Sequence, residues 1–95
     1  FVGIDAPEFN LGLAPALHAA GLRTVQYVSP QVWAWRRGRA ARMAAFVDLV
    51  LCLLPFECGV YDEAGLRSIF VGHPLADQLP LVPNRDAARR ELGLP

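Results

Sequence analysis

The sequence predicts an α/β fold, a doubly wound parallel sheet in which strands and helices alternate. Apolar runs rich in β-branched residues recur at roughly 20-residue intervals. Segments with the apolar spacing of amphipathic helices separate these runs, and a glycine follows several of them. This alternation is typical of parallel sheets with crossover connections.

The first half of the chain contains two predicted strands and two predicted helices. Residues 1–5 form an apolar strand that ends in an acid, and residues 8–20 form a helix that Gly21 ends. Pro15 either kinks that helix or marks its first turn. Residues 22–28 form the second strand, and residues 35–46 form a helix by propensity. In this helix we expect four residues to face the core and two arginines to stay in solvent: Ala40, Met43, Ala44 and Val47, and Arg39 and Arg42.

The second half repeats the pattern and then changes character. Residues 48–54 form a strand, and the next helix begins at residues 55–57 and runs to residue 64. Residues 67–71 form a fourth strand. Residues 75–83 are Pro-rich and read as a linker, after which Asn84 caps a helix over residues 85–92. We therefore expect a domain over residues 1–74, a linker over 75–83 and the start of a second domain over 84–95, so that the sequence is an internal piece of a longer protein.

Composition limits the classes of function. Over half of the 95 residues are hydrophobic, which is enough to fill a core. No apolar run reaches the roughly 18–20 residues that a membrane-spanning helix needs. The formal net charge of zero argues against a general nucleic-acid binder. Cys52 and Cys58 lack the spacing of a metal or redox motif, so we expect free thiols. The chain also lacks the glycine-rich nucleotide motifs, the nucleophile elbow of serine hydrolases and the zinc-protease motif.

The unusual residues gather just after the four predicted strands. These positions are residues 5–7, 29–35, 54–57 and 72–74. In a parallel α/β sheet, the carboxyl ends of the strands line the ligand crevice. The sequence therefore predicts a binding site at this edge of the sheet.

Each candidate site residue has a functional and a structural interpretation. Asp5 is either a general base for a hydroxyl group or a cap for the following N–H groups. Trp33, Trp35 and Arg36 either hold a sugar, an acyl chain or a phosphate, or pack the loop onto the sheet with the arginine in solvent. Glu57 either orients a ligand or complements the helix dipole. His73 is either a titratable group at the site or a tie between linker and sheet.

Four blocks of the sequence resemble lipid-A-disaccharide synthases, in the order and with the spacing of that family. The blocks are FVGIDAPEFN at residues 1–10, YVSPQVWAWR at 27–36, DLVLCLLPFE at 48–57 and FVGHPLAD at 70–77. The likeness extends from residue 1 to about residue 80. It implies an inverting glycosyltransferase with two Rossmann-like domains, the GT-B type, in which this chain is the later half of the N-terminal, acceptor-side domain.

The resemblance also implies an activity in the lipid A biosynthesis of Gram-negative bacteria, a step toward lipopolysaccharide. Such a transferase moves 2,3-diacylglucosamine from its UDP derivative to 2,3-diacylglucosamine 1-phosphate, forming a β(1→6) disaccharide 1-phosphate and releasing UDP. No cofactor and no metal are expected. The substrates carry long acyl chains, so the intact enzyme is expected to be a peripheral membrane protein on the cytoplasmic face of the inner membrane. We expect this piece alone to be inactive.

The family's motif positions assign roles to some residues. Asp5 falls on the family's essential aspartate, so the resemblance implies that it is the base or positions the acceptor. Arg36, Trp33 and Trp35 fall in the block where contact with acceptor phosphate or sugar is implied. Glu57 and His73 fall on motif positions without an assigned role. Two other hypotheses stay open: another two-domain UDP-sugar enzyme, and a non-catalytic binding module.

Overall fold

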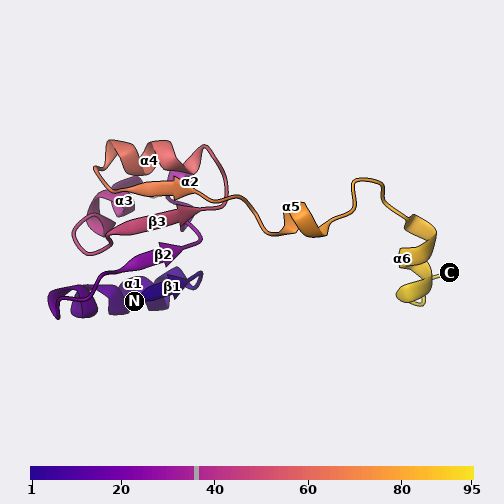
Figure 1. Ribbon diagram of the computed structural model, residues 1–95, viewed down its shortest axis with the longest axis horizontal. Coiled ribbons are helices and arrows are strands. Elements are labelled where there is room, and N and C mark those ends of the chain that lie inside the picture. Colours follow the sequence, from indigo (N-terminus) through magenta and orange to yellow (C-terminus); the bar gives the residue numbers. More distant parts are fainter. Residues whose placement is uncertain (36) are drawn as a thin grey trace.

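The protein forms a four-stranded parallel sheet with helices between successive strands (Figure 1). The computed structural model describes residues 1–35 and 37–95, except for the side chains of Trp33, Trp35 and Arg37. The strands are β1 (Val2–Ile4), β2 (Val25–Tyr27), β3 (Leu49–Cys52) and β4 (Ser68–Phe70), and they lie side by side in that order. The predicted α/β fold with a parallel sheet is confirmed.

The helices connect the strands and continue beyond them. They are α1 (Pro7–Ala19), α2 (Val32–Trp35), α3 (Arg37–Met43), α4 (Glu57–Glu63), α5 (Leu75–Gln78) and α6 (Arg85–Glu91). Pro15 lies within α1. Gly21, Gly65 and Gly93 follow α1, α4 and α6 with positive φ, as expected of glycines that end helices. The side chain of Asn84 accepts a hydrogen bond from the N–H of Ala87, so the predicted cap of α6 is confirmed.

The core lies between one face of the sheet and helices α2, α3 and α4. Val50 and Cys52 of β3 point to this face and are fully buried. They pack with residues from the helices and the segments beside them: Val32, Ala40, Met43, Val47, Tyr61 and Leu66. The predicted inward positions are confirmed for Ala40, Met43 and Val47. Ala44 is exposed instead, because it lies at the edge of the inward stripe that Ala40, Met43 and Val47 form.

The opposite face of the sheet is apolar and partly exposed in this chain. Strand residues alternate between the two faces, so Val2 and Ile4 point away from the core, as does Ile69. Their side chains are 58%, 64% and 42% exposed. In most parallel sheets other elements cover both faces, whereas here the described helices pack on one face only.

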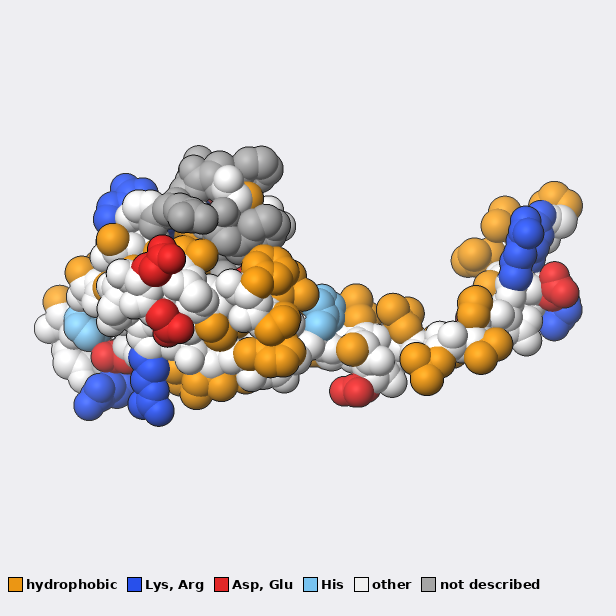
Figure 2. All heavy atoms as spheres, turned by 90° about the horizontal axis from the view of Figure 1, so that it is seen from above, with side chains coloured by type: hydrophobic (Ala, Val, Ile, Leu, Met, Phe, Trp, Pro, Cys, Tyr) orange, Lys and Arg blue, Asp and Glu red, His pale blue; other side chains and the backbone are white. Residues whose placement is uncertain are grey.

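The segment after β4 leads away from the sheet through α5 to α6, which lies at the far end of the molecule in Figure 1. Figure 2 shows hydrophobic side chains exposed along this segment. Leu81 and Val82 are among the most exposed hydrophobic residues of the described chain. The predicted linker therefore contains one short helix, α5, followed by residues without regular secondary structure. The assignment of residues 84–95 to a second domain stays a prediction.

Candidate active site

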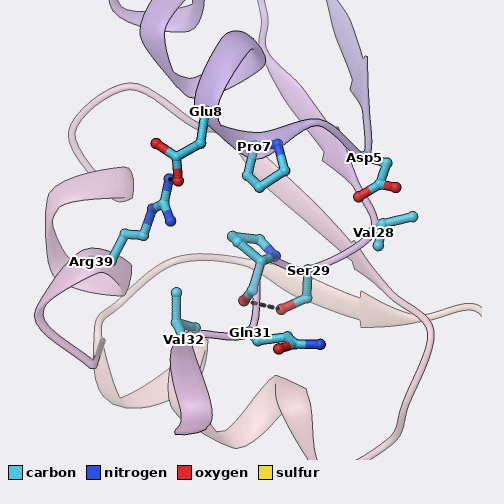
Figure 3. Close-up of a pocket in the computed structure, with 9 residues that line it drawn as sticks. Asp5, Pro7, Glu8, Val28, Ser29, Gln31, Val32 and Arg39 are labelled. Carbon is cyan, nitrogen blue, oxygen red and sulfur yellow. Dashed lines mark hydrogen bonds and ion pairs between the residues drawn. The ribbon is translucent and has the colours of Figure 1, made fainter. Parts of the chain in front are cut away.

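The carboxyl ends of β1 and β2 border an open pocket of about 560 Å³ (Figure 3). The turn from β1 into α1 contributes Asp5, Pro7 and Glu8. The segment after β2 contributes residues 28–32, and α3 contributes Arg39. In Figure 3, Asp5 lies on one side of the pocket and the Glu8–Arg39 pair lies on the other. The predicted edge of the sheet thus carries a cavity with charged groups on two walls.

The carboxylate of Asp5 has no hydrogen-bond or ion-pair partner among the described residues. The backbone N–H of Asp5 donates a hydrogen bond to the carbonyl of Tyr27 at 2.9 Å, which ties the turn to β2. Among the side chains that the structure describes, which exclude those of Arg36 and Arg37, no basic group forms an ion pair with the Asp5 carboxylate. The side chain does not cap α1 either, because no described N–H group donates a hydrogen bond to the Asp5 carboxylate; the hydrogen bonds to Asp5 are to its backbone carbonyl. The carboxylate is therefore free to accept a proton or a hydrogen bond from a ligand.

The backbone around this carboxylate is strained. Asp5, Ala6 and Val28 have φ values of 48°, 37° and 73°, in the left-handed region that favours glycine. Val28 is β-branched, and such residues rarely adopt this conformation. All three lie at the ends of the two strands that border the pocket. Strained conformations persist only where surrounding contacts impose them, and they cluster at functional sites.

The opposite wall carries an ion pair. Arg39 donates a hydrogen bond from Nη2 to Glu8 Oε1 at 3.0 Å, and the Arg39 side chain is only 16% exposed. The prediction that Arg39 stays in solvent is therefore wrong, because α3 packs beside α1 and brings the guanidinium against Glu8. Arg42 is exposed, as expected. These two arginines also border a second groove between α1 and α3, of about 360 Å³.

A smaller cavity of about 160 Å³ lies on the other side of the segment after β2. Glu57 and His73 border it together with Ser29 and Gln31, which also line the first pocket. Glu57 is buried, and its Oε2 accepts a hydrogen bond from the N–H of Leu54 at 3.1 Å. His73 is exposed, and its Nδ1 accepts a hydrogen bond from the N–H of Leu75 at 3.2 Å.

Ser29 is held in place by a hydrogen bond to Tyr61 of α4. Its hydroxyl lies 2.7 Å from the hydroxyl of Tyr61, and both residues are buried. Burial raises the pKa of Tyr61 to about 12, so the phenol stays protonated at neutral pH. This contact anchors the segment that separates the two cavities.

A further open cavity of about 520 Å³ lies after β4, bordered by His73, Pro74 and Asp77 among others. Cys52 and Cys58 are free thiols, as expected, and burial raises the pKa of Cys52 to about 12. Within the described residues, no three or more His, Cys, Asp or Glu side chains are grouped to hold a metal ion. No helix there has the length and apolar character needed to cross a bilayer.

Comparison with known proteins identifies the family. The family model described as "Lipid-A-disaccharide synthetase" matches residues 1–95. The chain belongs to this family. The lipid-A-disaccharide synthase of Burkholderia pseudomallei (strain 1710b) is 55% identical over 95 residues, which are 100% of this chain and 24% of that protein. The lipid-A-disaccharide synthase of Chromohalobacter salexigens is 59% identical over 93 residues, which are 98% of this chain and 24% of that protein.

Family membership confirms the resemblance that the four sequence blocks carry. The chain spans 24% of the length of these two lipid-A-disaccharide synthases. The fold brings the blocks together at one edge of the sheet. Asp5 borders the larger pocket, whereas Glu57 and His73 border the smaller cavity behind it. Arg36 and the side chains of Trp33 and Trp35 lie outside the described residues.

Several pocket residues escaped sequence analysis. Glu8 and Arg39 line the pocket and were not expected there. Asn10 and Gln26 lie outside the pocket lining, were not expected either, and contact the backbone of the Asp5 turn through their amides. A weak signal was present for the last two, because an amide at a position that faces the core needs a polar partner there. No signal in the sequence pairs Glu8 with Arg39, which are 31 residues apart.

Proposed function

We propose that this chain is the acceptor-side segment of a lipid-A-disaccharide synthase. The intact enzyme transfers 2,3-diacylglucosamine from its UDP derivative to 2,3-diacylglucosamine 1-phosphate. The observation that carries the proposal is the carboxylate of Asp5, which lies in the pocket at the strand ends without an ion-pair partner among the described side chains, in a chain that belongs to this family. Inside the proposal, residues 1–74 are the later half of the N-terminal domain, residues 75–83 link the domains, and residues 84–95 begin the UDP-sugar domain.

The proposed reaction inverts the anomeric carbon in a single displacement. The donor is α-linked and the product is β-linked, so the acceptor 6-hydroxyl attacks the face opposite to UDP. The new C–O bond forms as the bond from the anomeric carbon to the UDP oxygen breaks, and UDP leaves with the electron pair. Asp5 takes the proton of the attacking hydroxyl, a role that requires hydrogen-bond reach of that hydroxyl. Its position at the pocket wall, without a cation partner among the described residues, supports this role.

The acceptor is proposed to lie in the pocket between Asp5 and Arg39. Trp33, Trp35 and Arg36 follow the pocket-lining segment in sequence, and we assign them to the sugar and phosphate of the acceptor. Glu57 and His73 are proposed as outer contacts of the same substrate, because their cavity shares Ser29 and Gln31 with the pocket.

Substrates with two acyl chains place the enzyme at the cytoplasmic face of the inner membrane. Residues 9–47 contain five arginines and no acidic residue, a distribution suited to anionic head groups. Cosedimentation of the full-length enzyme with vesicles tests this role. We expect stronger binding when the vesicles contain anionic lipid, and equal binding to neutral vesicles would contradict the electrostatic contribution.

The base role of Asp5 is tested by Asp5→Asn in the full-length enzyme. The amide keeps the shape of the side chain and cannot take a proton, so we expect kcat for disaccharide formation to fall by about 10²–10⁴-fold. The matched control is Glu8→Gln, which removes a carboxylate from the same pocket and should reduce kcat far less. UDP affinity and the thermal unfolding midpoint should stay unchanged in Asp5→Asn. Near-normal turnover by Asp5→Asn would exclude Asp5 as the base and favour a non-catalytic role for this site.

A further inference from the structure

Two buried amide side chains lie directly behind the turn that carries Asp5. Asn10 of α1 is 7% exposed, and its Nδ2 donates to the carbonyls of Ile4 at 3.2 Å and Asp5 at 2.7 Å. Gln26 of β2 is 2% exposed, and its Nε2 donates to the carbonyl of Asp5 at 3.0 Å. The same Gln26 nitrogen lies 3.3 Å from the carbonyl oxygens of Tyr27 and Val28. We call Asn10 and Gln26 the amide brace.

The amide brace joins the two strained strand ends. Both amides meet at the carbonyl of Asp5, and Gln26 also contacts that of Val28. Asp5 and Val28 are two of the three non-glycine residues with positive φ in the described chain. Both carbonyl groups accept hydrogen bonds from these buried amides, and an acceptor away from water needs such a donor. The brace supplies those donors from two different elements.

Gly3 provides the space in which the brace fits. A Cβ atom at position 3 would lie 2.8 Å from Oε1 of Gln26 and 2.9 Å from Cβ and Cγ of Asn10. These distances are shorter than van der Waals contact, and both amides are held by hydrogen bonds. Any larger residue at position 3 must therefore displace Gln26 or Asn10 from the carbonyl groups.

We propose that Asn10 and Gln26 are positioning residues for Asp5. They do not reach the pocket; they hold the left-handed turn that presents the Asp5 carboxylate to it. This inference rests on the proposed function of Asp5 as the base. A displacement of about 1 Å in a catalytic group lowers the rate by as much as 10²-fold. Loss of the amide brace should therefore lower kcat, while the affinity for substrate groups that bind away from the turn stays nearly unchanged.

The first test replaces the donors by apolar side chains of similar size in the full-length enzyme. We expect Gln26→Met and Asn10→Leu to lower kcat by about 10-fold to 100-fold, with the KM for the UDP-sugar changed less than about 2-fold. Gly3→Ala should produce the same kinetic change although it leaves both amides in the sequence. If Gln26→Met or Asn10→Leu does not fold, Gly3→Ala still tests the inference. Leu66→Ala is the control for stability alone, because Leu66 is buried in the core without contacting the turn. It should lower the unfolding midpoint and leave kcat unchanged.

The second test is a double-mutant cycle with Asp5→Asn. A brace that acts through Asp5 has no effect once the carboxylate is gone, so Asp5→Asn/Gln26→Met should turn over as slowly as Asp5→Asn alone. If the two effects multiply, Gln26 has only a structural role and the inference is overturned. Wild-type kcat in Gln26→Met, with Asp5→Asn inactive, would overturn the brace but leave the base role intact. Wild-type kcat in Asp5→Asn would overturn both.

Discussion

Ala6 is the residue at which the strain of the site turn can be measured most directly. It has φ 37° and ψ 56°, it is exposed, and its side chain is a single methyl group. Ala6→Gly therefore removes the steric cost of a left-handed conformation with little loss of buried surface. We expect the free energy of unfolding to rise by about 0.5–1 kcal/mol. The midpoint of urea unfolding, followed by circular dichroism, measures this change.

The matched control for that substitution is Ala41→Gly. Ala41 is also exposed but lies within α3, where the conformation is right-handed. There the same substitution should lower the free energy of unfolding by about 0.5–1 kcal/mol, because glycine loses more backbone entropy in a helix. If Ala6→Gly raises the free energy of unfolding and Ala41→Gly lowers it, the strain lies in the turn. A lower stability of both variants would contradict it.

At the scale of single residues, the sequence indicates Asp5 as a site residue but not which side chains position it. An acid that directly follows an apolar strand stands out in a sequence. Gln26, inside a predicted strand, and Asn10, inside a predicted helix, do not stand out in the sequence, because both residue types are common on solvent-exposed faces. Their inward orientation follows from the pairing of β1 with β2 and from the packing of α1 on Gly3. These contacts are non-local, so no short motif encodes them.

At the scale of elements, Asp48 joins the start of β3 to the start of β2, at the edge of the sheet opposite to the pocket. The N–H of Thr24 donates to Asp48 Oδ2 at 2.8 Å. This hydrogen bond is the main cause that lowers the pKa of Asp48 below its usual value of 3.8. His18 and Arg23 lie 3.7 Å and 3.6 Å from the carboxylate and lower the pKa further.

This lowered pKa predicts acid sensitivity. A carboxyl group whose pKa is lower in the folded state stabilises the fold above its unfolded-state pKa, and the stabilisation disappears as the pH falls through the folded-state value. We expect the unfolding midpoint to fall as the pH drops below about 3.8, and to fall less steeply in Asp48→Asn. Asp77→Asn removes a charge from an exposed site and is the matched control. Equal slopes in Asp48→Asn and the unchanged chain would contradict the prediction.

Sequence analysis predicted the order of strands and helices well, because local signals specify them. The apolar runs predict the four strands. Glycines that follow helical segments predict helix ends, and three of them follow helices with positive φ. The region after β2 was less predictable: α2 already begins at Val32, before the predicted helix start. Propensity does not show that Val32 is 1% exposed and therefore belongs to the core.

At the scale of the whole molecule, the uncovered face of the sheet calls for other parts of the enzyme. We propose that segments of the longer lipid-A-disaccharide synthase cover it, since this chain spans 24% of its relatives. Val2→Thr/Ile69→Thr keeps β-branched side chains and reduces the apolar surface. In the chain expressed alone, we expect this double variant to self-associate less, as judged by analytical ultracentrifugation.

The same double variant should behave differently in the full-length enzyme. There the two side chains are expected to be buried, and a buried hydroxyl without a partner costs about 1–3 kcal/mol. The full-length variant should therefore have a lower unfolding midpoint. The control Leu81→Thr changes a fully exposed residue of the segment after α5 and should have little effect on self-association of the chain alone. An unchanged midpoint in the full-length double variant would mean that nothing covers this face.

The left-handed turn at Asp5 also has a consequence for the order of folding. Its local preferences disfavour it, and Gln26, which stabilises it, lies 21 residues later. While the chain is being synthesised, α1 can form before β2 exists, but the turn cannot yet take its final shape. The Asp5 carboxylate should reach its working position only when β2 pairs with β1. Pulse-labelled amide exchange would time this event: the N–H of Val25, which donates to Phe1, reports the pairing of β1 with β2, and the N–H of Asp5, which donates to Tyr27, reports the turn. Protection of Asp5 before Val25 would refute the proposed order.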